Sequence, residues 1–451
     1  MAKFDFKTKL PFGEMFLVKS SEIEGRIDID FYRPNLTEIE KKILAKSKKR
    51  LKDFALSMGS GATPSTTNPE FYSDKNGIPL LRVQNLTLNS TVELNNLKYI
   101  TEDVHENMLK RSQVTDQDLL VKITGVGRMA VAAVPPKEFS GNVNQHIVVV
   151  RTGSREKSLY LANYLNLDVI EKLASRRVTG GTRPALDYPA LRSIPIIEDI
   201  DFSILENAKK QANQLKQQAK TLLNSINSYL LGELGITLPE TDNSLNSRMF
   251  TVKMSDVGGG AFDPFTQFNK HYRIEGGKYP NERLDNIAFL QKGQSITSDD
   301  IVSGDYPVIA GGQTSPYSHN VCNHKGNVIT VSASGAYSGY VWYHDYSIFA
   351  SDCTVNFSKD ENKLITEFLA EVLKVKQQEI YLLQKGAGQP HVYPNDLAKL
   401  NIPLPDKPTQ QKIIAHIQAI KAQATALQAE AEQLLNQAKA EIEQMILGDG
   451  E

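Results

Sequence analysis

Two hydrophobic patterns alternate along the chain and predict its elements. Short apolar runs that are rich in β-branched residues and bounded by glycine, asparagine or proline predict strands. Longer stretches with apolar residues at helical spacing predict helices over 158–175 and 364–383. The clearest strand predictions are 78–83, 118–123, 146–150 and 327–332.

The same order of elements occurs twice. Six segments of the first half match six segments of the second half in sequence and in order, and the offset between them falls from 232 to about 207. The last pair is "TGGTRPALDYPALRSIPI" and "KGAGQPHVYPNDLAKLNIPL". We therefore predict an α/β fold with two similar mixed α/β units. The matched segments are 51–61 and 283–293, 77–87 and 305–315, 117–132 and 326–342, 144–150 and 351–357, 160–166 and 368–374, and 179–196 and 385–404.

A long helix is predicted after each unit. Apolar or small residues follow steps of three and four, the seam of a coiled coil. Ser203 and Glu206 form a capping-box pattern at the start of the first helix, and Pro408 precedes the second. The first seam is Leu205, Ala208, Ala212, Leu215, Ala219, Leu222, Ile226 and Tyr229. The second is Ile413, Ile417, Ile420, Ala424, Leu427, Ala431, Leu434 and Ala438, shifting towards Ile442 and Met445.

Two such helices either lie separately on the surface or pair with each other. Pairing is the simpler reading of two narrow, alanine-rich stripes, and we predict an antiparallel coiled coil. The first seam is roughly 36 Å long at about 1.5 Å per residue, close to one turn of B-DNA. The predicted organisation is a first domain at 1–197, a helix at 198–235, a second domain at 236–404 with a linker at 236–250, and a helix at 405–451.

Composition is that of a globular protein and restricts function only weakly. The 451 residues carry a net charge near −1, which neither indicates nor excludes a nucleic-acid partner. Cys322 and Cys353 are the two cysteines, too few for a disulfide framework or a zinc cluster, so we expect a reducing, cytoplasmic location. No stretch approaches the length of a membrane span, and the segment 1–10 lacks the apolar run of a signal peptide.

Catalytic motifs do not stand out. "NPEF" at 68–71 lacks the second proline of the methyltransferase stretch that it resembles, and "DVGGGAF" at 256–262 has no preceding strand. Neither a Walker A pattern nor H-E-x-x-H occurs, and the eight histidines are scattered. We therefore expect no catalytic residue, no metal site and no cofactor in this chain.

These features together resemble the specificity subunit of type I restriction-modification systems. The resemblance rests on "GSGATPSTTNPEFY", the strands followed by glycines in "DQDLLVKITGVG" and "KGNVITVSASGAYSG", the turn before Ile-Pro, and "IPLPDKPTQQKIIAHI". It implies two target-recognition domains that read the halves of a split DNA site, with the paired helices setting the spacer. It also implies two adenine-N6 methyltransferase subunits that use S-adenosylmethionine, and ATP-driven, Mg-dependent restriction subunits.

DNA-contacting residues are expected in the polar, glycine-containing loops of each unit. Arginine and glutamine suit the major-groove edges of guanine and adenine, and glycine lets the backbone approach phosphate. A two-module protein-interaction scaffold is the alternative function, and a solo methyltransferase is a third. The first-unit candidates are Arg82, Gln84, Asn85, Lys122, Thr124, Arg128, Arg176, Arg177, Thr182 and Arg183. The second-unit candidates are Gln313, Thr314, Ser332, Ser334, Tyr337, Lys385, Gln389 and His391.

Overall fold

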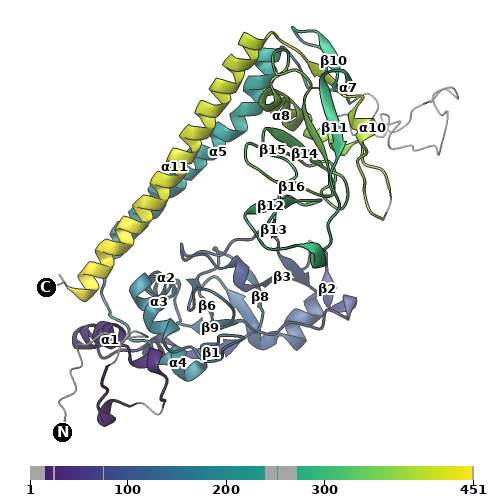
Figure 1. Cartoon of the computed structure of the whole chain (residues 1–451). Coiled ribbons are helices and arrows are strands. Elements are labelled where there is room, and N and C mark those ends of the chain that lie inside the picture. The colour runs from purple at the N-terminus through teal and green to yellow at the C-terminus, as the bar shows by residue number, and fades with distance from the viewer. Residues whose placement is uncertain are drawn as a thin grey trace. The chain divides into compact units, whose positions relative to one another are not determined.

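The computed structural model describes residues 16–23, 26–74, 76–238, 251, 272–386 and 388–448 (Figure 1). The segment at 1–10 and the glycine-rich stretch at 256–262 lie outside these residues. The chain forms two compact units, one of 1–215 with 429–451 and one of 216–428. No helix in the described part is long and apolar enough to cross a membrane.

The first unit is built on a four-stranded antiparallel sheet in the order β1-β9-β6-β7. Alternate residues of its central strands are buried on opposite faces, as the period of two requires. Leu119 and Val121 of β6 join the core beneath the helices, whereas Leu120 joins the core on the other face. The strands are β1 (Ser57–Ser60), β6 (Leu119–Lys122), β7 (Ala132–Ala133) and β9 (Ile147–Arg151).

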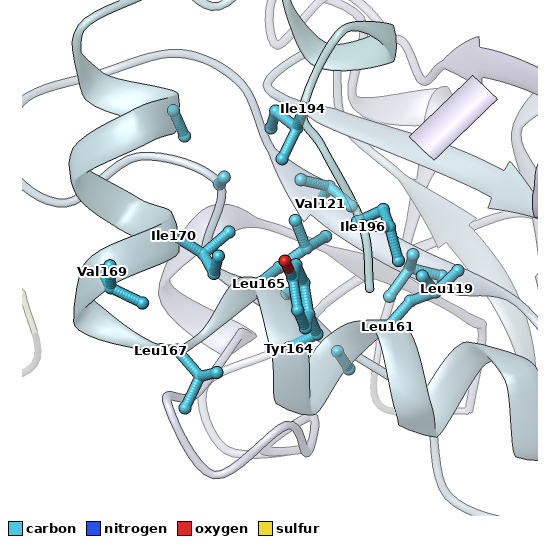
Figure 2. Close-up of a cluster of buried hydrophobic side chains, with 14 of the residues drawn as sticks. Leu119, Val121, Leu161, Tyr164, Leu165, Leu167, Val169, Ile170, Ile194 and Ile196 are labelled. Atoms are coloured by element: carbon cyan, nitrogen blue, oxygen red, sulfur yellow. The ribbon is translucent and has the colours of Figure 1, made fainter. Parts of the chain in front are cut away.

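Helices cover one face of this sheet. Figure 2 shows Leu119 and Val121 of β6 packed with Leu161 and Tyr164 of the helix at Arg155–Leu165, with Ile194 beside them. The continuous burial of β6 and β9 explains why their sequences read as unbroken apolar runs. The helices of this unit are α1 (Pro34–Lys46), α2 (Arg155–Leu165), α3 (Asp168–Ser175) and α4 (Tyr188–Arg192).

A second sheet belongs to the same unit, in the order β2-β4-β3-β8-β5, with β3 and β8 parallel. Leu81 and Val143 from this sheet share a core with Leu120 and Val149 from the first sheet. The strands are β2 (Tyr72–Ser73), β3 (Ile78–Leu81), β4 (Lys98–Ile100), β5 (Gln113–Thr115) and β8 (Ser140–Val143).

The second unit repeats this plan, which confirms the predicted duplication. Its four-stranded sheet has the order β11-β17-β14-β15, and its second sheet, β13-β12-β16, again contains one parallel pair. The second sheet has three strands where the first unit has five, so the two edge strands are particular to the first unit. The elements are β11 (Ala288–Lys292), β12 (Tyr306–Ile309), β13 (Ser318–His319), β14 (Val328–Ser332), β15 (Val341–His344), β16 (Phe349–Ala350), β17 (Cys353–Ser358), α8 (Thr366–Val375), α9 (Gln377–Tyr381) and α10 (Pro394–Leu397). A small ribbon of β10 (Asn281–Arg283) and β18 (Asn401–Pro403), with α7 (Leu284–Ile287), completes the unit.

Two long helices, α5 (Ser203–Leu234) and α11 (Lys407–Leu447), contribute to both units. In the first unit, Leu205 and Ala212 near the start of α5 share a core with Ala438 and Ile442 near the end of α11. In the second unit, the end of α5 shares a core with the start of α11. The pairing is therefore antiparallel, as predicted.

Details of the two helices differ from the sequence prediction. The capping box is not formed: Ser203 N donates to Asp201 Oδ1 at 2.8 Å, and Glu206 accepts from Asn163 and Lys209. Asp406 Oδ1 accepts from Thr409 N at 3.2 Å at the start of α11. Near the end of α11 Ile442 is buried as predicted, but Met445 is half exposed and Ile446 is buried instead; earlier in the seam Leu435 is buried rather than Leu434.

Candidate nucleic-acid interface

A pair of hydrogen-bonded loops stands at the end of β6 in the first unit. Gly125 N donates to Pro184 O at 3.1 Å, and Leu186 N donates to Ile123 O at 2.8 Å. Thr179 and Ala185 exchange two backbone hydrogen bonds of 2.9 and 2.8 Å, which close the second loop. The loop after β6 (residues 123–131) and the loop at 179–185 therefore form one element, which we call the first loop pair.

The second unit contains the same element, the second loop pair, made of residues 333–340, 385–386 and 388–391. Gly335 N donates to Pro390 O at 3.1 Å, and Val392 N donates to Ala333 O at 3.0 Å. Lys385 and His391 exchange hydrogen bonds of 2.9 and 2.8 Å. The repeated "TGGTRP" and "KGAGQP" motifs thus perform one structural task, namely to close a turn against the loop after a central strand.

Glycine is required at the matching position of both turns. Gly180 has φ +90°, and a Cβ atom there would lie 2.8 Å from Arg183 O. Gly386 has φ +105°, and a Cβ atom there would lie 2.7 Å from Gln389 O. A side chain at either position would both strain the backbone and collide with it. Backbone geometry alone therefore accounts for these two glycines, and no bound ligand is needed to explain them.

Three first-unit candidates, Gln84, Thr182 and Arg183, are exposed. Among the described residues none holds the Arg183 side chain by a hydrogen bond or an ion pair, so it is available to a ligand. Thr124 is half exposed and forms a bridge to Ala185 in the loop pair.

The prediction that Arg176 and Arg177 contact DNA is corrected, because both side chains are buried. Their guanidinium groups pair with the carboxylate of Glu40 on α1, and Arg50 joins the same carboxylate at 3.4 Å. Arg176 also lies over the ring of Phe31, 4.5 Å from its centroid. Burial lowers the pKa of Arg177, while Glu40 opposes that shift. With these partners the two arginines stabilise the packing of α1 on the unit, so we no longer expect them to contact bases.

The predictions for Asn85 and Lys122 are also corrected, because both side chains are buried and donate hydrogen bonds to backbone carbonyls. Asn85 is 1% exposed and donates to the carbonyls of Glu93 and Asn95 at 3.0 and 3.1 Å. Lys122 is 7% exposed, and its Nζ donates to Val126 O at 2.8 Å. Burial lowers the pKa of Lys122.

Arg82 and Arg128 are half buried and already have partners. Arg82 Nη2 donates to Asn96 O at 2.8 Å. Arg128 Nη2 donates to Asn166 O at 2.6 Å, and its Nη1 pairs with Asp168. Contact between either arginine and DNA would require exchange of these bonds.

The second unit brings more of its candidates together. Gln313, Thr314, Tyr337 and Gln389 are exposed, and burial raises the pKa of Tyr381 while the nearby Gln313 side chain opposes that shift. The turn that carries Gln313 packs on the second loop pair, because a Cβ atom at Gly311 would lie 2.6 Å from Ser334 O.

The remaining second-unit candidates have partners within the protein. Lys385 is exposed but pairs with Asp396 at 2.6 Å, and His391 is half exposed and stacked on Tyr393 with ring centroids 6.0 Å apart. Ser334 donates to the carboxylate of Asp352. Ser332 is 3% exposed, so the expectation that it contacts DNA is wrong.

The two loop pairs expose side chains of several kinds. In the described part of the chain no three histidine, cysteine, aspartate or glutamate residues are placed to hold a metal ion. Instead, each loop pair offers hydrogen-bonding and apolar side chains on a backbone fixed from below, an arrangement suited to recognition.

Val126 is the exposed residue of the first loop pair that the sequence reasoning missed. It is 84% exposed and lies between two glycines with positive φ. Polar residue types guided the search for candidates, so an apolar residue in "TGVGR" was passed over. The flanking glycines were the signal that could have found it.

Comparison with known proteins supports the resemblance stated from the sequence. Residues 278–437 match the family described as type I restriction modification DNA specificity domain. No curated protein matches the sequence.

Three solved structures are similar along most of the chain. They are a type I restriction-modification S subunit from M. genitalium (11% identity, 89% of this chain, 96% of that chain, TM-score 0.42), a chain from a type I R-M system studied for complex assembly (16%, 89%, 97%, 0.46), and the HsdS subunit from Thermoanaerobacter tengcongensis (15%, 89%, 96%, 0.33).

Proposed function

We propose that the chain, whose residues 278–437 match the family of type I restriction modification DNA specificity domains, is the DNA sequence-specificity subunit of a type I restriction-modification complex. Each unit reads one half of a bipartite DNA site. The subunit itself is non-catalytic, needs no cofactor and works in the cytoplasm.

The observation that carries this proposal is the duplicated loop pair. The two copies have the same backbone hydrogen bonds but expose different side chains, such as Arg183 in one and Gln389 in the other. A constant backbone with variable side chains is the requirement for reading two different short sequences.

The partners follow from the function. Two adenine-N6 methyltransferase subunits, which bind S-adenosylmethionine, modify the site, and ATP- and Mg-dependent restriction subunits cleave unmodified DNA. The chain supplies the sequence recognition that these subunits lack.

The scaffold alternative gains no support from the family match and differs in a measurable way. DNA binding releases counterions, so affinity falls steeply between low and physiological salt. A protein-interaction scaffold would show no preference for one duplex over a scrambled duplex at any salt concentration.

Methylation mapping tests the proposal directly. The chain is co-expressed with its methyltransferase subunits, and methylated adenines are located by single-molecule sequencing. We expect one bipartite motif with a fixed spacer. A continuous motif, or no motif that depends on the chain, would contradict the proposal.

The spacer length has its own test. Inserting one heptad into both α5 and α11 adds about 10 Å of helix, or about three base pairs at roughly 3.4 Å each. We expect the methylated motif to keep both half-sites and to lengthen its spacer. An unchanged spacer would refute the helices as the ruler.

A further inference from the structure

Val126 occupies the tip of the first loop pair, where an apolar side chain is unusual. It is 84% exposed, and its neighbours Gly125 and Gly127 have φ angles of +113° and +80°. A branched apolar side chain held in water gains free energy whenever a ligand covers it.

The backbone on either side of Val126 is fixed. Lys122 Nζ donates to Val126 O at 2.8 Å from a buried position beneath the tip. Gly125 N is bonded to Pro184 O, and Arg128 is bonded to Asn166 O and Asp168. Because the backbone is already ordered, binding at this tip incurs little additional entropy cost.

The residues around Val126 indicate which kind of ligand would cover its side chain. The loop that is hydrogen-bonded to its own carries the exposed Thr182 and Arg183. The corresponding loop of the second unit also presents an exposed aromatic residue, Tyr337, at 48% exposure. A single apolar side chain within polar and basic surroundings fits a duplex groove better than it fits an apolar protein surface.

We propose that Val126 is a specificity determinant that contacts the 5-methyl group of a thymine in the first half-site. Thymine is the base that offers an apolar group on its major-groove edge. This inference rests on the proposed function and adds one base preference to it. Insertion as a wedge between base pairs, or contact with a partner subunit, are the competing outcomes.

The experiment uses the full chain in complex with its methyltransferase subunits and a duplex that carries the mapped site. Each thymine of the first half-site is replaced in turn by deoxyuridine, which lacks the methyl group. For the unchanged chain we expect one such replacement to weaken binding about fourfold, the effect of one methyl group. For Val126→Ala we expect that same replacement to have no effect.

Two controls keep the result specific. Val302→Ala removes another exposed valine, from the second unit, and should leave every affinity unchanged. Tyr337→Ala should leave the deoxyuridine effect in the first half-site intact.

Three results would overturn the inference. They are a first half-site in which no thymine responds to deoxyuridine, an equal deoxyuridine effect in the unchanged chain and in Val126→Ala, or loss of subunit assembly in Val126→Ala. The failure of the proposed function looks different, because the unchanged complex would then bind the mapped and scrambled duplexes equally.

Discussion

The two loop pairs have one backbone and two kinds of surface chemistry. The first presents Arg183, which no described residue holds, beside the apolar Val126. The second presents Gln389 and Tyr337, and its cation, Lys385, is paired with Asp396. The two copies share the glycines and backbone contacts that set the shape of the loop pair, and they differ in the exposed side chains to which we assign the base preference. The predictions below separate these two roles.

The largest effect is expected at Glu40, which supports the first unit. Glu40→Ala removes the one carboxylate shared by Arg50, Arg176 and Arg177 and leaves buried positive charge. Breaking a buried ion pair on one side costs about 3–5 kcal/mol of unfolding free energy. Denaturant unfolding measures this loss. Glu38→Gln, at an exposed pair with Lys42, is the control, with an expected change below about 0.5 kcal/mol. Equal losses would show that the cluster is not structural.

A pH effect is expected in the second unit. Burial lowers the pKa of His344 to about 4, and its Nε2 lies 2.8 Å from Thr330 Oγ1. Below about pH 6.5 the imidazole of His344 is therefore protonated in the unfolded state but stays neutral in the folded state. Stability should therefore fall by about 2 kcal/mol from pH 7.5 to pH 5. Burial also lowers the pKa of His324, so His344→Gln should remove the larger part of this slope, not all of it. A slope that survives intact would contradict the assignment.

Much of the fold was predictable from the sequence, because the signals were local. Strands β3, β6 and β14 lie within the predicted apolar runs, β9 extends one residue beyond its run, and the duplication predicted the shared topology. The partners of the arginines were not predictable. Glu40 pairs with Arg176 from 136 residues away, and no periodicity reveals that contact. The capping-box pattern at Ser203 failed because Asp201, just before it, competes for the same backbone amide.

A smaller effect is expected on first-site recognition. Arg183→Ala should weaken methylation of duplexes with the correct first half-site about tenfold, because a bidentate arginine–guanine contact contributes about 1–3 kcal/mol. Arg33→Ala, at an exposed arginine paired with Asp30, is the matched control and should have no such effect. Methylation rates on duplexes altered in one half-site at a time make the comparison. An effect on both halves would contradict the assignment.

The smallest effect is expected at Gln389. An amide makes weaker contacts than a guanidinium group, so Gln389→Ala should reduce discrimination in the second half-site about fivefold, or about 1 kcal/mol. Gln384→Ala is an informative contrast, because Gln384 Nε2 donates inward to Ser338 O at 2.7 Å. That change should lower stability and leave the preferred bases unaltered. Altered bases in Gln384→Ala would show that shape, not Gln389, sets the preference.

The most direct test of the central claim compares the methylated motifs of the unchanged chain, Arg183→Glu and Gln389→Ala in cells that carry the methyltransferase subunits. If the two units read DNA independently, Arg183→Glu should change the base preference of one half-site alone, and Gln389→Ala should change that of the other half-site alone. A variant that alters both halves together, or two variants that alter the same half, would contradict the claim.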